Sequence, residues 1–116
     1  MRVLMIIPAY NEEESIFDTV TSILSYRKKV DFDLDYVVIN DGSTDKTKQI
    51  LEDNHFNAVN LVMNLGIGGA VQTGYKYALE HDYDVAVQFD GDGQHDIESL
   101  SDLLEPIRKN EADLVI

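Results

Sequence analysis

Short apolar runs alternate along this chain with segments in which apolar residues recur at helical spacing. The runs lie at residues 3–7, 36–39, 59–63, 85–89 and 114–116, and they are rich in β-branched side chains. Strands that are apolar along their whole length are typical of parallel sheets covered by helices on both faces. The alternation therefore predicts an α/β fold with a doubly wound, mainly parallel sheet flanked by helices.

Polar residues mark where the first two helices are expected to begin. Asn11 is a suitable N-cap, and Glu14 follows it three residues later, as in a capping box. A second helix is expected to start near Ser43 or Thr44, with Asp45 in its first turn. Each helix would thus begin shortly after a strand ends.

Four helices are expected, each with one apolar face directed at the sheet. The face of the third helix carries only small residues, which would let this helix lie close to the strands. Pro106 lies within the fourth helix, which should begin near residue 97, and is expected to kink or end it. The residues expected to face the sheet are Ile16, Phe17, Val20, Ile23 and Leu24, then Ile50 and Leu51, then Ala70, Gly74 and Ala78, then Leu100, Leu103, Leu104 and Ile107.

Composition narrows the class of protein. The chain has 116 residues, 44% of them hydrophobic, which is enough for a single domain over residues 1–116. Its net charge of −13 argues against nucleic acid and anionic membrane surfaces as partners. The absence of cysteine excludes disulfides and fits a cytoplasmic location. No apolar run is long enough to span a bilayer, and the first is interpreted as a strand rather than a signal peptide.

Polar or glycine-rich loops follow four of the predicted strands. Their sequences are "PAYNEEE", "NDGSTD", "NLGIGGA" and "DGDGQH". In open parallel sheets, ligands bind at the carboxyl ends of the strands, where these loops should meet. The sequence therefore predicts one binding site, built from four loops, at this edge of the sheet.

The loop after the fourth strand carries two aspartates that should point the same way. Asp90 and Asp92 are two residues apart, and Gly91 and Gly93 would let the backbone approach a ligand closely. With the amide oxygen of Gln94 they form an all-oxygen set suited to Mg²⁺ or Mn²⁺, completed by water or phosphate oxygens. A solvated Asp-Gly turn with no metal is the alternative interpretation of the same residues.

Three other kinds of site have sequence motifs that these loops match only in part. An EF-hand is excluded, because His95 stands where glycine is required and Ser101 where glutamate is required. A dinucleotide-binding glycine loop is poorly matched, because Val71 replaces its third glycine. A phosphatase of the haloacid dehalogenase type, with Asp90 as nucleophile and Mg²⁺ as cofactor, remains an alternative. Its motif normally follows the first strand, whereas this one follows the fourth.

Taken together, the segments "IIPAYNEEESI", "VVINDGSTDKT", "NLGIGGAVQTGYKYA" and "VQFDGDGQHDIESL" resemble the successive N-terminal motifs of family 2 glycosyltransferases with the GT-A fold. The resemblance is greatest to the branch that includes dolichyl-phosphate mannosyltransferases and bacterial polyprenyl-phosphate relatives. It covers essentially the whole chain and implies the N-terminal, nucleotide-sugar-binding portion of an enzyme that continues further. A binding module without catalysis is the second functional interpretation.

The resemblance also implies roles for individual positions. Two departures from the family pattern are noted: Asn40 stands where aspartate is frequent, and glycine occupies the middle of the D-x-D motif. The implied ligands are Pro8, Tyr10 and Glu12 for the base and ribose, Ile39 and Asp41 for the base, Asp90, Gly91 and Asp92 for the diphosphate, and Asp90, Asp92 and Gln94 for the metal.

The expected reaction partners follow from the same resemblance. The donor would be a GDP- or UDP-linked sugar, bound through Mg²⁺ or Mn²⁺, and transfer would proceed with inversion. The acceptor would be a polyprenyl phosphate or a growing glycan, as in cell-wall or polysaccharide biosynthesis. Acceptor-side and catalytic residues are expected beyond this chain. So are any segments that would hold the protein at the cytoplasmic face of a membrane.

Overall fold

The computed structural model describes residues 1–90. Within these residues, four strands form one sheet: β1 (Arg2–Ala9), β2 (Asp33–Asn40), β3 (Ala58–Asn60) and β4 (Val85–Gln88). Their order is β3-β2-β1-β4, and all three pairings are parallel. The predicted helix from residue 97 and the predicted strand at 114–116 lie outside the described residues, as do Gly91, Asp92 and Gln94.

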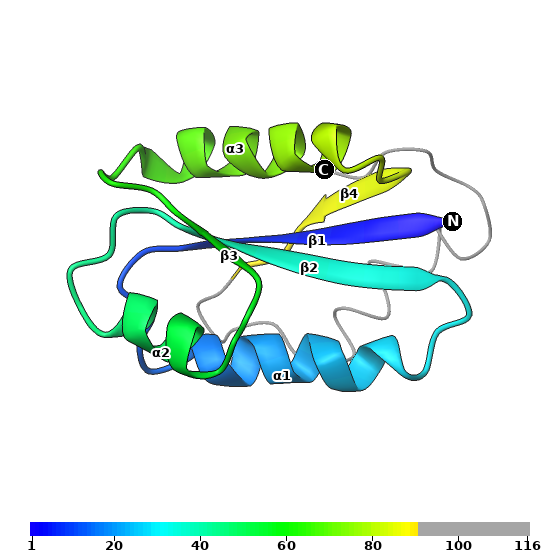
Figure 1. Cartoon of the computed structure of the whole chain (residues 1–116), viewed down its shortest axis with the longest axis horizontal. Coiled ribbons are helices and arrows are strands. Elements are labelled where there is room, and N and C mark those ends of the chain that lie inside the picture. The colour runs from blue at the N-terminus through cyan, green and yellow to red at the C-terminus, as the bar shows by residue number, and fades with distance from the viewer. Residues whose placement is uncertain (91–116) are drawn as a thin grey trace.

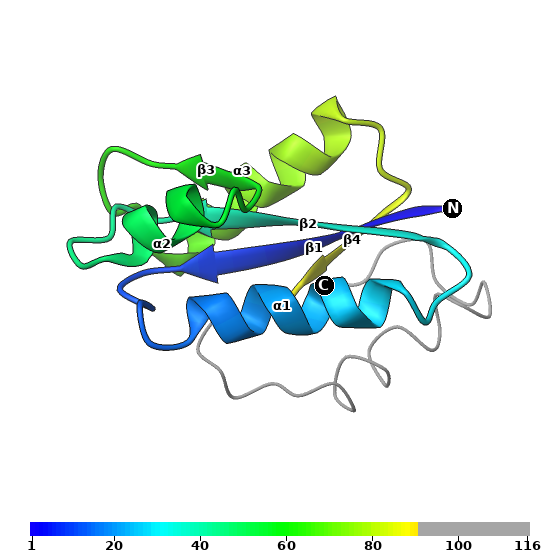
Figure 2. The same cartoon turned by 60° about the horizontal axis from the view of Figure 1, so that its bottom comes forward.

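Three helices in the described part of the chain cover the two faces of this sheet. Helices α1 (Ile16–Arg27) and α2 (Thr47–Asp53) lie on one face, and α3 (Gly66–Glu80) lies on the other (Figures 1 and 2). The chain places β2 and β3 on one side of β1, then crosses over the sheet through α3 to form β4 on the other side. This arrangement confirms the predicted doubly wound α/β fold. It also creates a crevice at the carboxyl ends of β1 and β4, where the direction of winding reverses.

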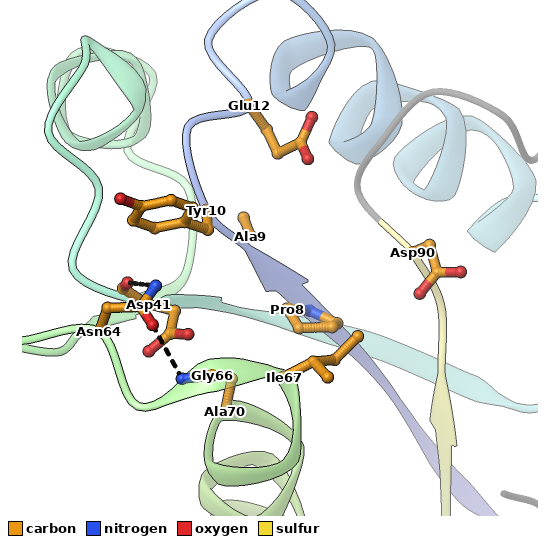
Figure 3. Close-up of a pocket in the computed structure, with 10 residues that line it drawn as sticks. All are labelled: Pro8, Ala9, Tyr10, Glu12, Asp41, Asn64, Gly66, Ile67, Ala70 and Asp90. Atoms are coloured by element: carbon orange, nitrogen blue, oxygen red, sulfur yellow. Dashed lines mark hydrogen bonds between the residues drawn. The ribbon is translucent and has the colours of Figure 1, made fainter.

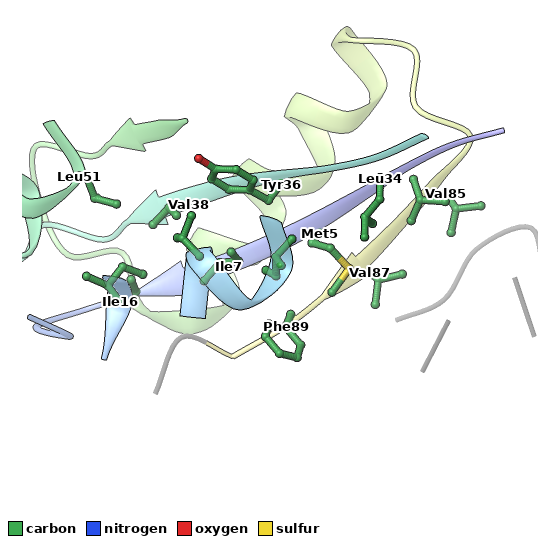
Figure 4. Packing of buried hydrophobic residues seen from close by; sticks show 14 residues of the cluster. Met5, Ile7, Ile16, Leu34, Tyr36, Val38, Leu51, Val85, Val87 and Phe89 are labelled. Atoms are coloured by element: carbon green, nitrogen blue, oxygen red, sulfur yellow. The ribbon is translucent and has the colours of Figure 1, made fainter. Parts of the chain in front are cut away.

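The core has two layers, one on each side of the central strand β1. Val3, Met5 and Ile7 pack toward α1 and α2 (Figure 4), whereas Leu4 and Ile6 pack toward α3. All five side chains are 0% exposed. Strict alternation along a strand that is buried on both faces explains why its sequence is apolar at every position from Val3 to Ala9. No helix in the described part of the chain is long and apolar enough to cross a membrane.

Helix α3 lies close to the sheet through small side chains, as predicted. Ala70, Gly74 and Ala78 are its buried residues. A Cβ atom built on Gly74 would lie 2.3 Å from Cγ2 of Ile6, so only glycine fits at this crossing. The small-residue face therefore sets the distance between α3 and β1.

Both predicted helix starts were wrong. Helix α1 begins at Ile16 with Ser15 in the N-cap position, because Asn11 adopts a left-handed backbone conformation (φ 54°) that is incompatible with a helix start. Helix α2 begins at Thr47, so Asp45 precedes the helix instead of lying in its first turn. Phe17 was also misplaced: it is 46% exposed and contacts the ring of Phe56, with ring centroids 5.9 Å apart.

The third strand is shorter than its apolar run predicts. It ends at Asn60, whereas the run extends to Met63. Val62 is fully exposed and Met63 is 62% exposed, because the chain leaves the sheet here to reach the start of α3. Apolar character in this segment therefore belongs to a surface loop.

Candidate functional site

A pocket of about 360 Å³ lies at the carboxyl edge of the sheet, where the sequence places its site. Its walls come from the ends of β1, β2 and β4, from the segments that follow them, and from the first turn of α3 (Figure 3). A few hundred cubic ångströms is the size of a small-molecule site. The lining residues are Pro8, Ala9, Tyr10, Glu12, Asp41, Asn64, Gly66, Ile67, Ala70 and Asp90.

Five of the residues predicted to bind a nucleotide sugar line this pocket: Pro8, Tyr10, Glu12, Asp41 and Asp90. They are up to 82 positions apart in the chain, and the parallel topology brings them to one edge. Their contact with a ligand stays a prediction.

Ile39, which the resemblance also implied, does not line the pocket. Its side chain is 0% exposed and packs in the core layer on the α3 side of the sheet. The same core layer includes Ala70, which does line the pocket. Gly91, Asp92 and Gln94 lie outside the described residues, so their predicted roles stay predictions.

Asp41 ties the start of α3 to the end of β2. It is only 3% exposed, and its backbone N–H donates to the carbonyl oxygen of Ala9 at 2.8 Å. Its Oδ1 accepts a hydrogen bond from the backbone N–H of Leu65 at 2.7 Å. The side-chain amide of Asn64 donates to the backbone carbonyl of Asp41 at 3.2 Å. These bonds hold the carboxylate of Asp41 in one orientation at the pocket wall.

Gly42 allows this arrangement because it has no side chain. Its φ is +70°, and a Cβ atom there would lie 2.6 Å from both the backbone nitrogen of Asn64 and the carbonyl carbon of Met63. The segment that leads into α3 therefore passes directly over Gly42. The glycine of "NDGS" thus permits the close approach that lets Asp41 reach Leu65.

The pocket combines apolar walls with polar groups. Tyr10 and Ile67 are 45% and 64% exposed, and with Pro8 they offer flat or apolar surface. Figure 3 shows Tyr10 and Asp41 on one side of the opening and Asp90 on the other, with Pro8 and Ile67 between them. Such a pocket suits an elongated ligand with a planar ring at one end and a charged group at the other.

Two carboxylates give the outer part of the pocket a negative charge. Glu12 accepts a hydrogen bond from the Ser15 hydroxyl at 3.1 Å, and Asp90 accepts one from the Gln88 amide at 3.4 Å. No group of three or more histidine, aspartate or glutamate side chains suited to a metal occurs among residues 1–90. Asp90 is the described member of the predicted metal set. Its carboxylate lines the pocket, and its role as a metal ligand stays a prediction.

Sequence reasoning missed the small lining residues Ala9, Gly66 and Ala70, and two lining residues with larger side chains, Asn64 and Ile67. Asn64 bonds to Asp41 and also accepts a hydrogen bond from the backbone N–H of Gly66 at 3.1 Å. Both residues lie in the "NLGIGGA" segment, which was recognised as a loop near the site but assigned no individual role. The sequence signal that could have identified Asn64 is an asparagine two positions before the glycine-rich start of α3.

Comparison with protein families and curated proteins gives a consistent result. Residues 5–116 match the family model described as Glycosyl transferase family 2. Undecaprenyl-phosphate mannosyltransferase of Micrococcus luteus is 40% identical over 121 residues, which cover 100% of this chain and 47% of that protein. UDP-N-acetylglucosamine–dolichyl-phosphate N-acetylglucosaminyltransferase of Methanococcus voltae is 33% identical, with 98% and 50% covered. The chain thus spans about half the length of these curated relatives.

Solved structures agree on the fold. S. aureus TarS (1–349) in complex with UDP is 29% identical with a TM-score of 0.67, covering 94% of this chain and 32% of that one. Glucosyl-3-phosphoglycerate synthase from Mycobacterium tuberculosis, solved with Mn²⁺ and UDP-glucose, is 23% identical with a TM-score of 0.72, covering 95% and 40%. The second likeness concerns the fold alone. These neighbours confirm the predicted GT-A-like architecture.

Proposed function

We propose that this chain, which belongs to glycosyl transferase family 2, binds the nucleoside-diphosphate sugar from which the full-length enzyme transfers a sugar to a polyprenyl phosphate or glycan. The observation that carries the proposal is the pocket itself. It brings together Pro8, Tyr10, Glu12, Asp41 and Asp90. These residues come from separate sequence motifs and were predicted to bind the nucleotide sugar.

The inner part of the pocket suits a nucleoside. Asp41 is held in a fixed orientation by the N–H of Leu65, so its carboxylate is preorganised to accept a hydrogen bond from an N–H of a base. Tyr10 and Pro8 offer surface against which the base and ribose would pack. Both uracil and guanine carry a ring N–H, so this chemistry fits a UDP- or a GDP-linked donor.

The outer part of the pocket would face the diphosphate, and there a cation is required. Glu12 and Asp90 are carboxylates, and the whole chain carries a net charge of −13, so an anionic diphosphate would be repelled without one. Asp90, with Asp92 and Gln94, would hold Mg²⁺ or Mn²⁺. When bound, such a metal neutralises the charge that develops on the leaving diphosphate.

The acceptor is proposed from the relatives, whose names include undecaprenyl-phosphate and dolichyl-phosphate transferases. A phosphate oxygen is already ionised at neutral pH, so it would need little help from a general base. Attack from the face opposite the diphosphate would invert the configuration at the sugar carbon. The residues that bind the acceptor are proposed to lie in the part of the relatives that this chain does not span.

Family membership weighs against the phosphatase alternative. Asp90 follows β4, whereas the nucleophile of haloacid dehalogenases follows the first strand. The remaining alternative is a nucleotide-sugar-binding module without turnover. A sugar-transfer assay on the full-length protein separates this alternative from the enzyme.

The proposal is tested by calorimetric titration of the full-length protein with UDP and GDP, each with and without Mn²⁺ or Mg²⁺. We expect one nucleotide to bind in a metal-dependent manner, and we expect Asp92→Ala to lose that dependence. Ser101→Ala, which changes a residue outside the predicted metal set, is the control. A folded protein that binds neither nucleotide under any of these conditions would contradict the proposal.

A further inference from the structure

The loop that follows β1 is hydrogen-bonded to the loop that follows β2, through residues that do not line the pocket. The side-chain oxygen of Asn11 accepts hydrogen bonds from the backbone N–H groups of Thr44, at 2.8 Å, and Asp45, at 3.3 Å. In return, the backbone N–H of Asn11 donates to the hydroxyl oxygen of Ser43 at 3.0 Å. The same oxygen also accepts from the Thr44 hydroxyl at 3.4 Å, so this asparagine makes four bonds to a segment more than thirty positions away in the sequence.

A second set of hydrogen bonds, made by Asp45 and Thr47, joins the same two loops. Oδ2 of Asp45 accepts from the backbone N–H of Glu13 at 3.3 Å, and Oδ1 accepts from the backbone N–H of Thr47 at 2.9 Å. The Thr47 hydroxyl donates to the same Oδ1 at 2.5 Å and accepts from the backbone N–H of Glu12 at 2.9 Å. Thr47 is 0% exposed, so the bonds that it makes are partly buried, whereas the bond between Glu13 and Asp45 is exposed.

These bonds hold an unfavourable backbone conformation in place. Asn11 has φ 54°, a left-handed conformation that costs a residue with a side chain free energy unless its surroundings fix it. The residues on either side of it, Tyr10 and Glu12, both line the pocket. The turn at Asn11 therefore sets where these two pocket residues point.

We propose that Asn11, Asp45 and Thr47 form an interloop clamp that positions Tyr10 and Glu12 for the nucleotide sugar. The clamp residues are positioning residues, since none of them lines the pocket. This inference rests on the proposed function. It also gives a role to the part of "NDGSTDKT" that follows the pocket residue Asp41. In that part, Ser43, Asp45 and Thr47 hydrogen-bond to the loop after β1.

Loss of the clamp has a definite consequence for binding. Without the clamp, the loop after β1 samples other conformations. The apparent affinity for the nucleotide is then reduced in proportion to the fraction of molecules that keep the binding-competent loop conformation. The sheet and both core layers do not depend on these exposed loop contacts. The clamp therefore affects ligand affinity more than global stability.

The test measures nucleotide affinity and thermal stability of the full-length protein with UDP and GDP in the presence of Mn²⁺. Asn11→Gly removes the side-chain bonds but tolerates the positive φ, and Asp45→Ala removes the carboxylate. We expect each to weaken binding about tenfold, and their combination to weaken it by less than the product of the two, because they act as one unit. Asp45→Asn keeps one acceptor oxygen for Thr47 and should recover part of the affinity. Asp53→Asn, at the exposed end of α2, is the control.

A transfer assay gives a second readout that a purely structural role would not change. The clamp variants should raise the KM for the donor while the rate at saturating donor stays within about twofold. Unchanged affinity in Asn11→Gly and Asp45→Ala, with wild-type protein that binds nucleotide, would overturn the clamp and leave the proposed function standing. Wild-type protein that binds neither nucleotide would overturn both.

Discussion

Replacement of Gly42 by alanine is expected to destabilise the protein more than the same replacement at Gly66. Both glycines have positive φ, 70° and 82°, so alanine at either position costs roughly 1–2 kcal/mol in backbone conformation. Only at Gly42 would the new Cβ meet backbone atoms, at 2.6 Å, whereas nothing lies within 4 Å at Gly66. Overpacking against backbone adds roughly 1–3 kcal/mol, because no side-chain rotation can relieve it.

We therefore expect Gly42→Ala to lower the free energy of unfolding by about 3 kcal/mol and Gly66→Ala by about 1 kcal/mol. Equilibrium unfolding in urea, followed by circular dichroism, measures both values under one condition. The difference between the two losses of unfolding free energy measures the steric cost of the backbone at Met63 and Asn64 lying against residue 42. Equal losses would refute it, because they would mean that only the positive φ matters.

Three further predictions concern the helix packing and two titrating groups. Gly74→Ala should lower the unfolding midpoint, because its Cβ would lie 2.3 Å from a buried side chain of β1, whereas Gly68→Ala in the same helix meets nothing within 4 Å and should raise it. Burial, together with a hydrogen bond to Asp35 at 2.8 Å, raises the pKa of Tyr83 to about 12. The stability that this adds is present below pH 10 and lost as the pH rises toward 12, a dependence that should be weaker in Tyr83→Phe than in the wild type when stability is measured across alkaline pH. Burial acts to raise the pKa of Asp45, but the hydrogen bonds that it accepts from Thr47 outweigh burial and lower the pKa below 3.8. The stability that the Asp45 carboxylate contributes should therefore be lost as the pH falls below that value. The unfolding midpoints of the wild type and Asp45→Ala should converge in acid.

The sheet and the packing of α3 could be predicted from the sequence because each depends on local periodicity. Strand β1 is apolar from Val3 to Ala9 because both of its faces are covered, and this pattern has few other physical explanations. Gly74, four positions from both Ala70 and Ala78, likewise indicated a close helix. In these cases the information lies within one element.

The loops could not be predicted in the same way, because their conformations depend on contacts between segments distant in the sequence. Asn11 reads as an N-cap when only its neighbours are considered, yet its side chain bonds to Thr44 and Asp45. Met63 reads as part of a strand, yet the chain must leave the sheet to pass over Gly42. The five predicted residues that line the pocket were recognised through family motifs, which record such long-range contacts indirectly.

The central claim is that the donor nucleotide binds in the pocket between Tyr10, Asp41 and Asp90. Ile67 lines this pocket and is 64% exposed, so Ile67→Trp should fill the opening with little effect on stability. Leu79→Trp, at an 80% exposed position near the other end of α3, is the matched control. We predict that Ile67→Trp weakens metal-dependent nucleotide binding by calorimetry at least tenfold, while Leu79→Trp binds like the wild type. Wild-type affinity in a folded Ile67→Trp protein would contradict the claim that the nucleotide occupies this pocket.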